Sequence, residues 1–438
     1  MIILRTVKNI SSLNIAASVL LFLAAILAAV VANSSLSPVY QDFLLQELHL
    51  RIGNFNLFSH GGHPLKMIEF INDCLMTVFF LAVGLEIKRE LLVGELSSVR
   101  KAALPFIAAC GGMVVPVVIY ALSVASGTPE TRGMAIPMAT DIAFSLGVLS
   151  LLGKRVPLSL KIFLTAFAVV DDIGGILVIA MFYSADVAYG YLIAAAVLYV
   201  FLYYMGKFGV TQKIFFLFFG VIIWYLFLQS GIHSTISGVI LAFVIPARPR
   251  LDAGKYIERI RDIIGEFPLS KSDNIVLTNA QIATLKQVER ASDYVISPLQ
   301  SLEDNLHGAV SFVILPLFAF ANAGVVFSGS GSIVGDVSIA VAAGLLLGKF
   351  LGIYLFTWLA VKSGVALMPA GMNWKNIAGV SLLGGIGFTV SLFIANLSFA
   401  DEYPELLNQA KFGVLVGTVL AGVLGYVVLN WVLPKREK

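Results

Sequence analysis

The chain consists of long apolar segments separated by short polar turns. Twelve segments approach the 20 or so apolar residues that a helix needs to cross a hydrocarbon layer about 30 Å thick. They cover residues 13–32, 67–90, 103–125, 133–152, 157–183, 187–206, 212–228, 231–247, 306–327, 337–361, 376–398 and 411–433. The pattern predicts an all-α polytopic membrane protein of about 12 transmembrane helices, with a single transmembrane domain over residues 1–438.

Lysine and arginine are concentrated in alternate connections, as expected if those connections are cytoplasmic. The cationic connections and chain ends hold Arg5, Lys8, Arg100, Lys101, Lys154, Arg155, Lys161, Lys207, Lys213, Lys362, Lys375, Lys435, Arg436 and Lys438. The turns near Asp186 and Gly231 contain no cation, and the turn after 376–398 is acidic. Both termini are therefore predicted to be cytoplasmic, and 212–228 and 231–247 are predicted to be two helices rather than one broken helix.

The first apolar segment, Leu13 to Ala32, follows Arg5 and Lys8. A cleaved signal peptide has the same order of charge and apolar sequence, but its apolar core is only about 7–15 residues long. Because this segment is long enough to span the bilayer, we interpret it as a membrane helix.

Two parts of the chain depart from the membrane-helix pattern. Residues 249–301 are polar, with nearly balanced charges, and are predicted to form cytoplasmic surface helices joined by loops. They are either a solvated insertion or a regulatory element. On the other side, Leu48 to Ile52 alternates apolar and polar residues before Gly53-Asn54, which predicts a small extracytoplasmic β-hairpin, with an irregular loop as the alternative.

Composition agrees with a membrane protein. Hydrophobic residues make up 58% of the chain and charged residues 13%, and the mean hydropathy is +0.92; soluble domains are about 25% charged. Cys74 and Cys110 lie in apolar segments and indicate neither a metal site nor a disulfide framework. No basic face indicates nucleic-acid binding. We expect no cofactor.

Four charged residues lie inside the apolar segments, namely Asp141, Asp171, Asp172 and Lys349. Each costs about 2.5–3.5 kcal/mol at the bilayer centre, so charges that persist there line a water path, form pairs or bind an ion. Asp171 and Asp172 have long apolar stretches on both sides, and they are the strongest candidates for a functional site.

The adjacent carboxylates have the chemistry of ion exchange. Burial and a neighbouring like charge both favour the protonated form of a carboxyl group. Ionised carboxylates also supply the oxygen ligands that small hard cations prefer. A proton and a cation compete for the same oxygens, so a site that opens to one side of the membrane at a time exchanges them.

Two helices are predicted to be interrupted. Pro137 lies just before Asp141 in the fourth segment, and Gly384-Gly385-Ile386-Gly387 weakens the eleventh. Interruptions at matching positions of two halves are typical of transporters built from inverted repeats. Asp141 would offset the positive N-terminal ends of the half-helices and Lys349 the negative C-terminal ends. An ordinary kink is the alternative for Pro137 alone.

Glycines surround the intramembrane lysine. Gly344, Gly348 and Gly352 flank Lys349 at four-residue spacing, which lets a second helix approach closely. Lys349 is therefore predicted to face a packed protein interior rather than lipid, where it either pairs with a carboxylate or offsets helix ends.

A second group of charges lies near predicted helix ends. The charges at the end of 67–90 form either a charged helix terminus or a mouth that attracts cations. Where the chain re-enters the membrane, His307 follows acidic residues and could titrate near neutral pH. His233 is either a satisfied polar residue or a second sensor. The candidate entrance and pH-sensing residues are Glu86, Arg89, Glu90, His233, Glu303 and His307.

Several long ordered motifs carry a family resemblance. They are FFLAVGLEIKREL (79–91), AIPMATDIAFSLGVLSLLG (135–153), LTAFAVVDDIGGILVIA (164–180), GIHSTISGVILAF (231–243), LPLFAFANAGV (315–325) and LLGGIGFTVSLFIANLSF (382–399). The chain resembles the NhaA-type sodium–proton antiporters from end to end, apart from the charged insertion.

The resemblance implies twelve helices, with the fourth and eleventh unwound where they cross. It implies that Asp171 and Asp172 bind Na⁺ or Li⁺ and carry protons. It also implies that Thr140 and Asp141 support the crossing region and that Lys349 pairs with Asp171.

The resemblance further implies how the protein works in the cell. Exchange would be electrogenic, with more protons imported than Na⁺ exported, and it would be activated at alkaline pH through the entrance residues. The protein would be a homodimer in the bacterial inner membrane, joined partly through the hairpin near Leu45–Leu57. Two departures concern the pH response: the long connection before the ninth helix, and Asp304 where the family pattern has a histidine.

Two other functions need similar residues. An intramembrane aspartyl protease also uses buried aspartates as an acid–base pair, but the chain has no Gly-x-Gly-Asp motif. A sodium-coupled symporter of an organic anion could have a similar fold, but no second polar cluster is evident for its solute. We therefore predict an antiporter rather than an enzyme.

Overall fold

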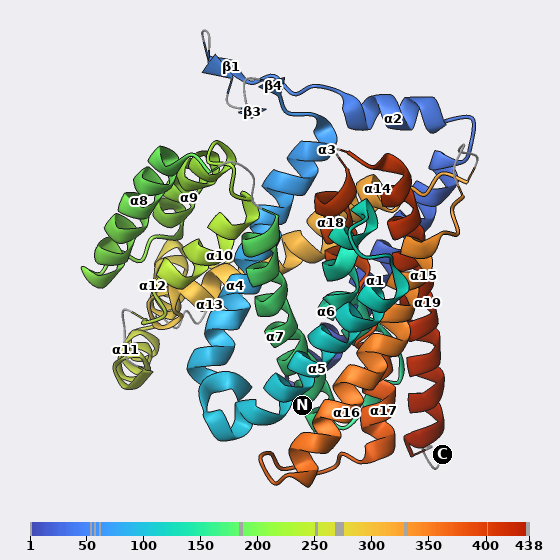
Figure 1. Ribbon diagram of the computed structural model, residues 1–438. Helices are drawn as coiled ribbons and strands as arrows, with labels where there is room; N and C mark the ends of the chain where they lie inside the picture. Colours follow the sequence, from blue (N-terminus) through green and yellow to red (C-terminus); the bar gives the residue numbers. More distant parts are fainter. Residues whose placement is uncertain are drawn as a thin grey trace.

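The computed structural model describes residues 2–52, 55–56, 58–60, 63–183, 187–249, 253–267, 276–327, 332–400 and 402–434. Helices dominate, and most run side by side along a common direction (Figure 1). In the described residues, 8 helices are long and apolar enough to cross a membrane, or up to 10 if each of two bent pairs is one span. The multi-pass helical prediction is confirmed, whereas the count of twelve stays a prediction.

The elements in chain order are α1 (Ile2–Ala32), α2 (Ser37–Leu45), β1 (Arg51–Ile52), β2 (Phe55–Asn56), β3 (Ser59–His60), β4 (His63–Pro64), α3 (Met67–Phe70), η1 (Ile71–Leu75), α4 (Met76–Val93), η2 (Glu95–Ser97), α5 (Val99–Ser123), η3 (Pro129–Met138), α6 (Ile142–Leu151), η4 (Gly153–Arg155), α7 (Leu158–Phe182), α8 (Tyr189–Lys207), α9 (Lys213–Leu228), α10 (Thr235–Val244), α11 (Ala253–Gly265), α12 (Asn279–Val295), α13 (Pro298–Ala309), η5 (Val310–Ile314), α14 (Leu315–Asn322), α15 (Asp336–Ala343), η6 (Gly344–Gly348), α16 (Lys349–Lys362), α17 (Trp374–Leu383), α18 (Phe388–Phe399) and α19 (Pro404–Val432).

The two bent pairs meet at their breaks. The 3₁₀ helix η3 and α6 bend by 45°, and α17 and α18 bend by 44°. Between the members of each pair lie residues 139–141 and 384–387. The Asp141 N–H donates to the Ile386 carbonyl at 2.6 Å and so joins one break to the other. Gly387 permits this approach, because a Cβ there would lie 3.1 Å from a carbonyl oxygen of the first break.

Helices α5 and α16 pack backbone against backbone. A Cβ on Gly111 would lie 2.3 Å from the Gly352 carbonyl oxygen, and a Cβ on Gly352 would lie 2.1 Å from that of Gly111. One turn earlier, a Cβ on Gly348 would lie 2.6 Å from the Pro116 Cα. Lys349, which follows Gly348 and begins α16, is consequently buried in the protein interior.

Short strands stand at the end of the bundle opposite the chain termini (Figure 1). β1 and β2 pair antiparallel, with Arg51 opposite Asn56. β3 and β4 form a second antiparallel pair, which the sequence did not predict. The predicted turn residues Gly53 and Asn54 lie outside the described residues.

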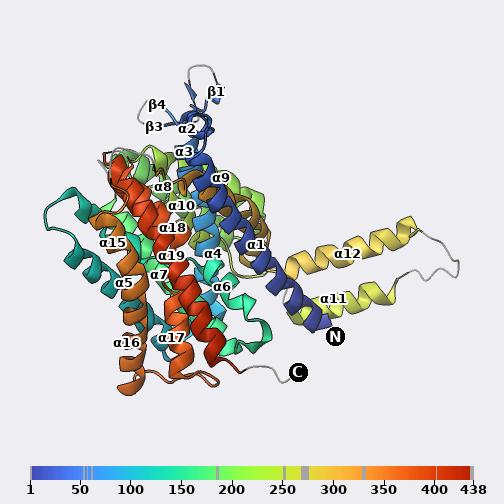
Figure 2. The same ribbon diagram turned by 90° about the vertical axis from the view of Figure 1, so that its right-hand side faces the viewer.

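The charged insertion contains two helices, α11 and α12, which lie against each other. They leave the bundle sideways as a hairpin (Figure 2). At its base, the Leu299 N–H at the start of α13 donates to the Pro246 carbonyl just after α10, at 3.2 Å. Residues 250–252 and 268–275 of the insertion lie outside the described part of the chain.

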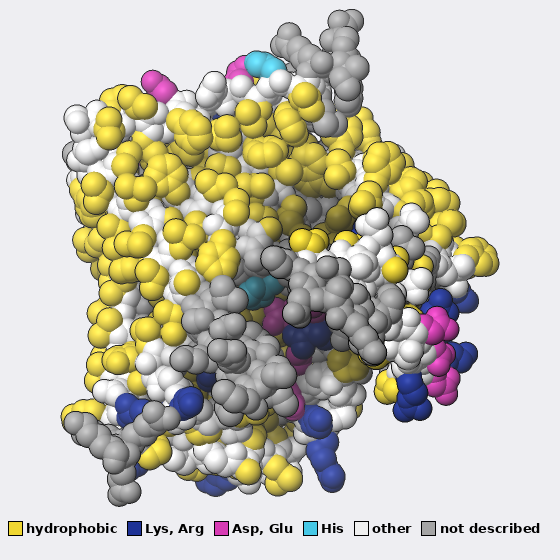
Figure 3. All heavy atoms as spheres, turned by 180° about the vertical axis from the view of Figure 1, so that it is seen from behind, with side chains coloured by type: hydrophobic (Ala, Val, Ile, Leu, Met, Phe, Trp, Pro, Cys, Tyr) yellow, Lys and Arg dark blue, Asp and Glu magenta, His cyan; other side chains and the backbone are white. Residues whose placement is uncertain are grey.

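Charge and hydrophobicity are separated on the outer surface. Hydrophobic side chains cover most of one face, and charged side chains gather toward the end of the bundle that holds the termini (Figure 3). This is the side predicted to be cytoplasmic. Several charges used for that prediction lie outside the described residues, namely Asp186, Asp401, Lys435, Arg436 and Lys438.

Because α5 and α16 are in backbone contact, one added methyl group between them should lower the stability of the protein. Gly352→Ala forces the two helices apart, and overpacking of this kind costs about 1–3 kcal/mol. We expect a lower thermal unfolding midpoint in detergent. Gly190→Ala is the matched control, because a Cβ on this α8 residue meets no atom within 4 Å. Equal midpoints for the two variants would contradict the packing described here.

Candidate ion-binding site

Two neighbouring aspartates lie near the middle of the 25-residue helix α7. Asp171 is 1% exposed and Asp172 is 6% exposed. Consecutive residues on a helix point about 100° apart, so the two carboxylates share one region but face different partners. Both are therefore held away from bulk water in a helix long enough to cross the membrane.

Asp171 faces the interior and is bound by two side chains. The Lys349 ammonium donates to Asp171 Oδ2, and both side chains are 0% exposed. The Thr140 hydroxyl lies 2.7 Å from the same oxygen and 2.8 Å from the Gly384 carbonyl oxygen. A hydroxyl has one proton to donate, so it serves one of these acceptors at a time. Asp171 Oδ1 is buried and has no hydrogen-bond partner among the residues that the structure describes.

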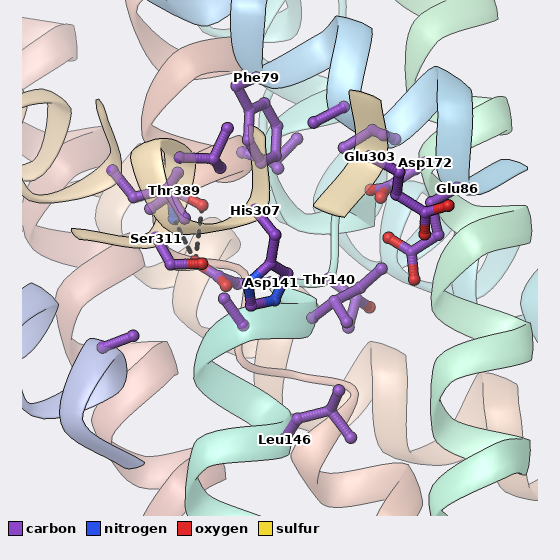
Figure 4. A pocket seen from close by; sticks show the side chains of 18 of the residues that line it. Phe79, Glu86, Thr140, Asp141, Leu146, Asp172, Glu303, His307, Ser311 and Thr389 are labelled. Atoms are coloured by element: carbon purple, nitrogen blue, oxygen red, sulfur yellow. Dashed lines mark hydrogen bonds between the residues drawn. The ribbon is translucent and has the colours of Figure 1, made fainter. Parts of the chain in front are cut away.

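Asp172 faces a pocket of about 290 Å³. In the described residues its carboxylate makes no hydrogen bond or ion pair. Figure 4 shows Asp172 and Glu86 on one side of this pocket and Asp141 with Thr389 on the other. Thr140 also lines the pocket, so its hydroxyl stands between the pocket and Asp171.

Asp141 joins the N-terminal ends of two half-helices. It is the N-cap of α6, where Oδ1 accepts from the Phe144 N–H at 3.0 Å. Its Oδ2 accepts from the Thr389 N–H at 3.1 Å and from the Thr389 hydroxyl at 2.6 Å, in the first turn of α18. A carboxylate at this position offsets the positive ends of both helix dipoles.

The sequence left two roles open for Lys349. Its side chain was expected either to pair with a carboxylate or to offset the C-terminal ends of the half-helices, and its side-chain partner is Asp171. Neutral side chains meet the C-terminal carbonyls instead. The Ser145 hydroxyl donates to the Leu383 carbonyl at 3.0 Å, and Thr140 approaches that of Gly384.

Three charged residues predicted for an entrance, Glu86, Arg89 and Glu303, line the same pocket, whereas Glu90 is not among its lining residues. Arg89 donates to Glu303 at 2.9 Å, lies 3.0 Å from Glu90 and lies 4.0 Å from Glu86. His307 lines the same pocket. Figure 3 shows acidic, basic and histidine side chains together in a hollow on this face.

Lys88, in the same sequence cluster, has a separate role. Its ammonium reaches the carbonyls of Ala242, Phe243 and Ile245 at the C-terminal end of α10. A cation there satisfies carbonyl groups that have no partner within the helix.

His233 lies apart from the entrance residues and does not line the pocket. Its Nε2 is 3.6 Å from Asp73 Oδ1, its Nδ1 is 3.0 Å from the Thr235 hydroxyl, and its ring contacts Phe393 edge to face. The Asp73 carboxylate also accepts from the Ser234 hydroxyl at 3.2 Å.

Sequence reasoning missed several polar residues around the site. Thr389, which binds Asp141, lies two positions after the predicted glycine break, and that position was the available signal. A buried amide chain runs from Asn396 to Asn322 and from Asn322 to Asn72, with both hydrogen bonds at 2.8 Å. Each of these asparagines is an isolated amide within an apolar segment, and nothing in the sequence marked it as part of the site.

Comparison with known proteins identifies the family. The family model described as Na⁺/H⁺ antiporter 1 matches residues 8–429. The chain is 76% identical over 437 residues to the Na(+)/H(+) antiporter NhaA of Bacteroides fragilis and 74% identical over 438 residues to that of Bacteroides thetaiotaomicron, with 100% of each chain covered. It is 47% identical to that of Porphyromonas gingivalis, with 98% and 96% covered.

Among solved structures, the chain is similar to the sodium proton antiporter MjNhaP1 from Methanocaldococcus jannaschii. The match has 12% identity and a TM-score of 0.49, and it covers 99% of this chain and 100% of that one. The assignment rests on the family model and on the close relatives. The chain belongs to the Na⁺/H⁺ antiporter 1 family.

Proposed function

We propose that this chain exchanges Na⁺ for H⁺ across the bacterial membrane, with Asp171 and Asp172 as the carboxylates that bind both ions. One observation carries the proposal: the Asp172 carboxylate is buried, faces the pocket and has no partner in the described residues. The relatives named Na(+)/H(+) antiporter support the same reaction. Family membership supports a transporter rather than an enzyme.

Competition at the carboxylates provides the coupling. A cation that enters the pocket encounters Asp172, with the Thr140 hydroxyl oxygen also at the pocket wall. A buried carboxylate binds either a proton or a cation, because leaving its charge uncompensated is costly. Na⁺ therefore binds by displacing the Asp172 proton, and a returning proton displaces Na⁺.

The ion pair between Lys349 and Asp171 provides the second proton of the exchange, which comes from Lys349. When Asp171 turns toward Na⁺, its contact with Lys349 is lost and a buried ammonium remains without a counter-ion, which is strongly unfavourable. We propose that Lys349 then releases a proton as well, so that two protons exchange for each Na⁺. Exchange of this kind is electrogenic. A potential-sensitive dye tests it, and exchange that generates no potential would exclude this step.

In our proposal, the point where the two bent helix pairs meet lets the site open to one side of the membrane at a time. The N-terminal ends of α6 and α18 meet at Asp141, so that a small movement of the half-helices shifts the site without exposing backbone to lipid. We retain twelve spans, with each bent pair as one span and the shorter helices α9 and α10 as two more. We also retain cytoplasmic termini, inverted repeats and a homodimer joined partly through the strand pairs; light scattering in detergent tests the dimer.

Removing the proton-binding oxygen of Asp172 should abolish exchange. For Asp172→Asn we expect no Na⁺-dependent proton movement across everted vesicles, with normal amounts of protein in the membrane, because an amide neither titrates nor balances Na⁺. Asp42→Asn, in an exposed part of α2, is the control and should retain activity. Exchange by Asp172→Asn at the wild-type rate would remove the basis of the proposal.

The buried ion pair predicts a pattern of stability changes. Lys349→Gln leaves the Asp171 charge buried without its cation, and loss of one partner of such a pair costs about 3–5 kcal/mol. We expect a lower unfolding midpoint in detergent, and recovery in the double variant Asp171→Asn/Lys349→Gln. Lys375→Gln, on the exposed side of α17, should behave as wild type. The proposal fails here if the double variant is less stable than Lys349→Gln.

We propose that Arg89 and its acidic neighbours Glu86, Glu90 and Glu303 set the pH dependence of exchange. Exchange is activated at alkaline pH. Glu303→Gln removes one of the three acidic partners of Arg89 and should change the pH of half-maximal exchange. Asp42→Asn is the control, because this exposed carboxylate of α2 forms no ion pair in the described residues. Superimposable pH profiles for Glu303→Gln and wild type would place the pH response elsewhere.

A further inference from the structure

The α11–α12 hairpin has one clearly amphipathic helix. In α11 the apolar residues recur at helical spacing, with charged residues on the opposite side. One half of the apolar stripe contacts α12: Ile263 is buried, and the Tyr256 hydroxyl lies 2.9 Å from that of Ser292. The other half is uncovered, since Ile257 and Ile264 are each 59% exposed.

Helix α12 has a matching exposed stripe. Ala291 is buried on the side that faces α11, whereas Ile282 is 37% exposed and Leu285 is 45% exposed. These two residues are three positions apart, so they lie on one side of the helix.

The two exposed stripes lie on the same face of the hairpin. Viewed along α11 from its N-terminus, Ile257 and Ile264 lie roughly 90° clockwise from the side that contacts α12. Ile282 and Leu285 lie a similar angle counter-clockwise from the contact side of α12, because α12 runs the opposite way. The hairpin therefore has one apolar face, and the opposite face carries charged residues such as Lys255.

The position of the hairpin suggests what covers this face. Its base is tied to the end of α10 by the bond between Leu299 and Pro246, and the Lys213 ammonium at the start of α9 donates to the Ser301 hydroxyl of α13 at 2.7 Å. These are helix ends on the side predicted to be cytoplasmic. From there the hairpin extends sideways and not along the bundle axis (Figure 2).

The charges at the edges of the face are also informative. By helical spacing, Arg261 lies beyond Ile257 at the outer edge of α11, and Lys286 lies beyond Ile282 at the outer edge of α12. Basic residues beside an apolar helix face are typical of helices that lie at a membrane surface. Glu289 lies on the same face, so apolar contact rather than charge alone must hold the hairpin.

We propose that the α11–α12 hairpin lies on the cytoplasmic leaflet of the membrane that holds the bundle. Ile257, Ile264, Ile282 and Leu285 enter the boundary between headgroups and acyl chains, and Arg261 and Lys286 reach lipid phosphates. The inference needs only that the bundle is embedded in the membrane, so it does not depend on the exchange reaction proposed above.

Site-specific fluorescence in vesicles tests the contact. Full-length protein lacking Cys74 and Cys110 receives one cysteine, through Ile257→Cys or through Lys255→Cys on the opposite face, and each is labelled with an environment-sensitive fluorophore. In vesicles of phospholipids with brominated acyl chains we expect the label at residue 257 to shift to the blue and lose fluorescence. The label at residue 255 should do neither. Equal thermal unfolding midpoints for the two samples verify that the protein is folded.

A second reporter on α12 extends the test. A label introduced through Leu285→Cys should also be quenched, and Ile257→Ser/Ile264→Ser in the same chain should reduce that quenching. Equal, weak quenching at residues 255 and 257 would overturn the proposal. So would quenching and a blue shift that require two protomers in one nanodisc, because a second copy of the chain would then cover this face.

Discussion

Charged side chains held where water cannot reach them are the constraint on which the rest of the structure depends. Asp171 and Lys349 have no exposed side-chain surface, and withdrawing each charge from water costs several kcal/mol. The glycine contact between α5 and α16 keeps lipid away from Lys349, and Thr140 provides a further hydrogen-bond donor near Asp171. The pair is therefore only as stable as the packing around it. In the proposed exchange, Na⁺ competes for Asp171, and the energy of this arrangement becomes available to release protons.

The two bent helix pairs meet a related constraint. Interrupting a helix inside a membrane leaves N–H and carbonyl groups without partners, and lipid offers none. In this chain the two breaks supply partners to each other: Asp141 binds both N-terminal ends, while Ser145 and Thr140 meet carbonyls at the C-terminal end of α17. These bonds connect two helix pairs directly beside Asp171 and Asp172. A movement that changes the crossing must therefore also change the environment of the carboxylates.

The sequence predicted the parts of this arrangement whose signal is local. Pro137, the glycines at 384–387 and the aspartates of α7 each stand out within one apolar segment. Partnerships between segments far apart in the chain were harder to predict. Asp141 and Thr389 are separated by 248 positions, and a threonine in an apolar helix carries no cost that would mark it. The pairing of Asp73 with His233 was missed for the same reason, and so were the uncovered face of the hairpin and the second strand pair, which depend on how neighbouring elements pack.

The central claim is that Na⁺ and H⁺ displace one another at Asp172, and proton release from purified protein tests it most directly. Na⁺ is added to the protein in weakly buffered detergent solution, and the change in pH is recorded. The account predicts prompt acidification that saturates with Na⁺ and is absent from Asp172→Asn. Na⁺ binding detected by a rise in the unfolding midpoint, without any release of protons, would contradict it.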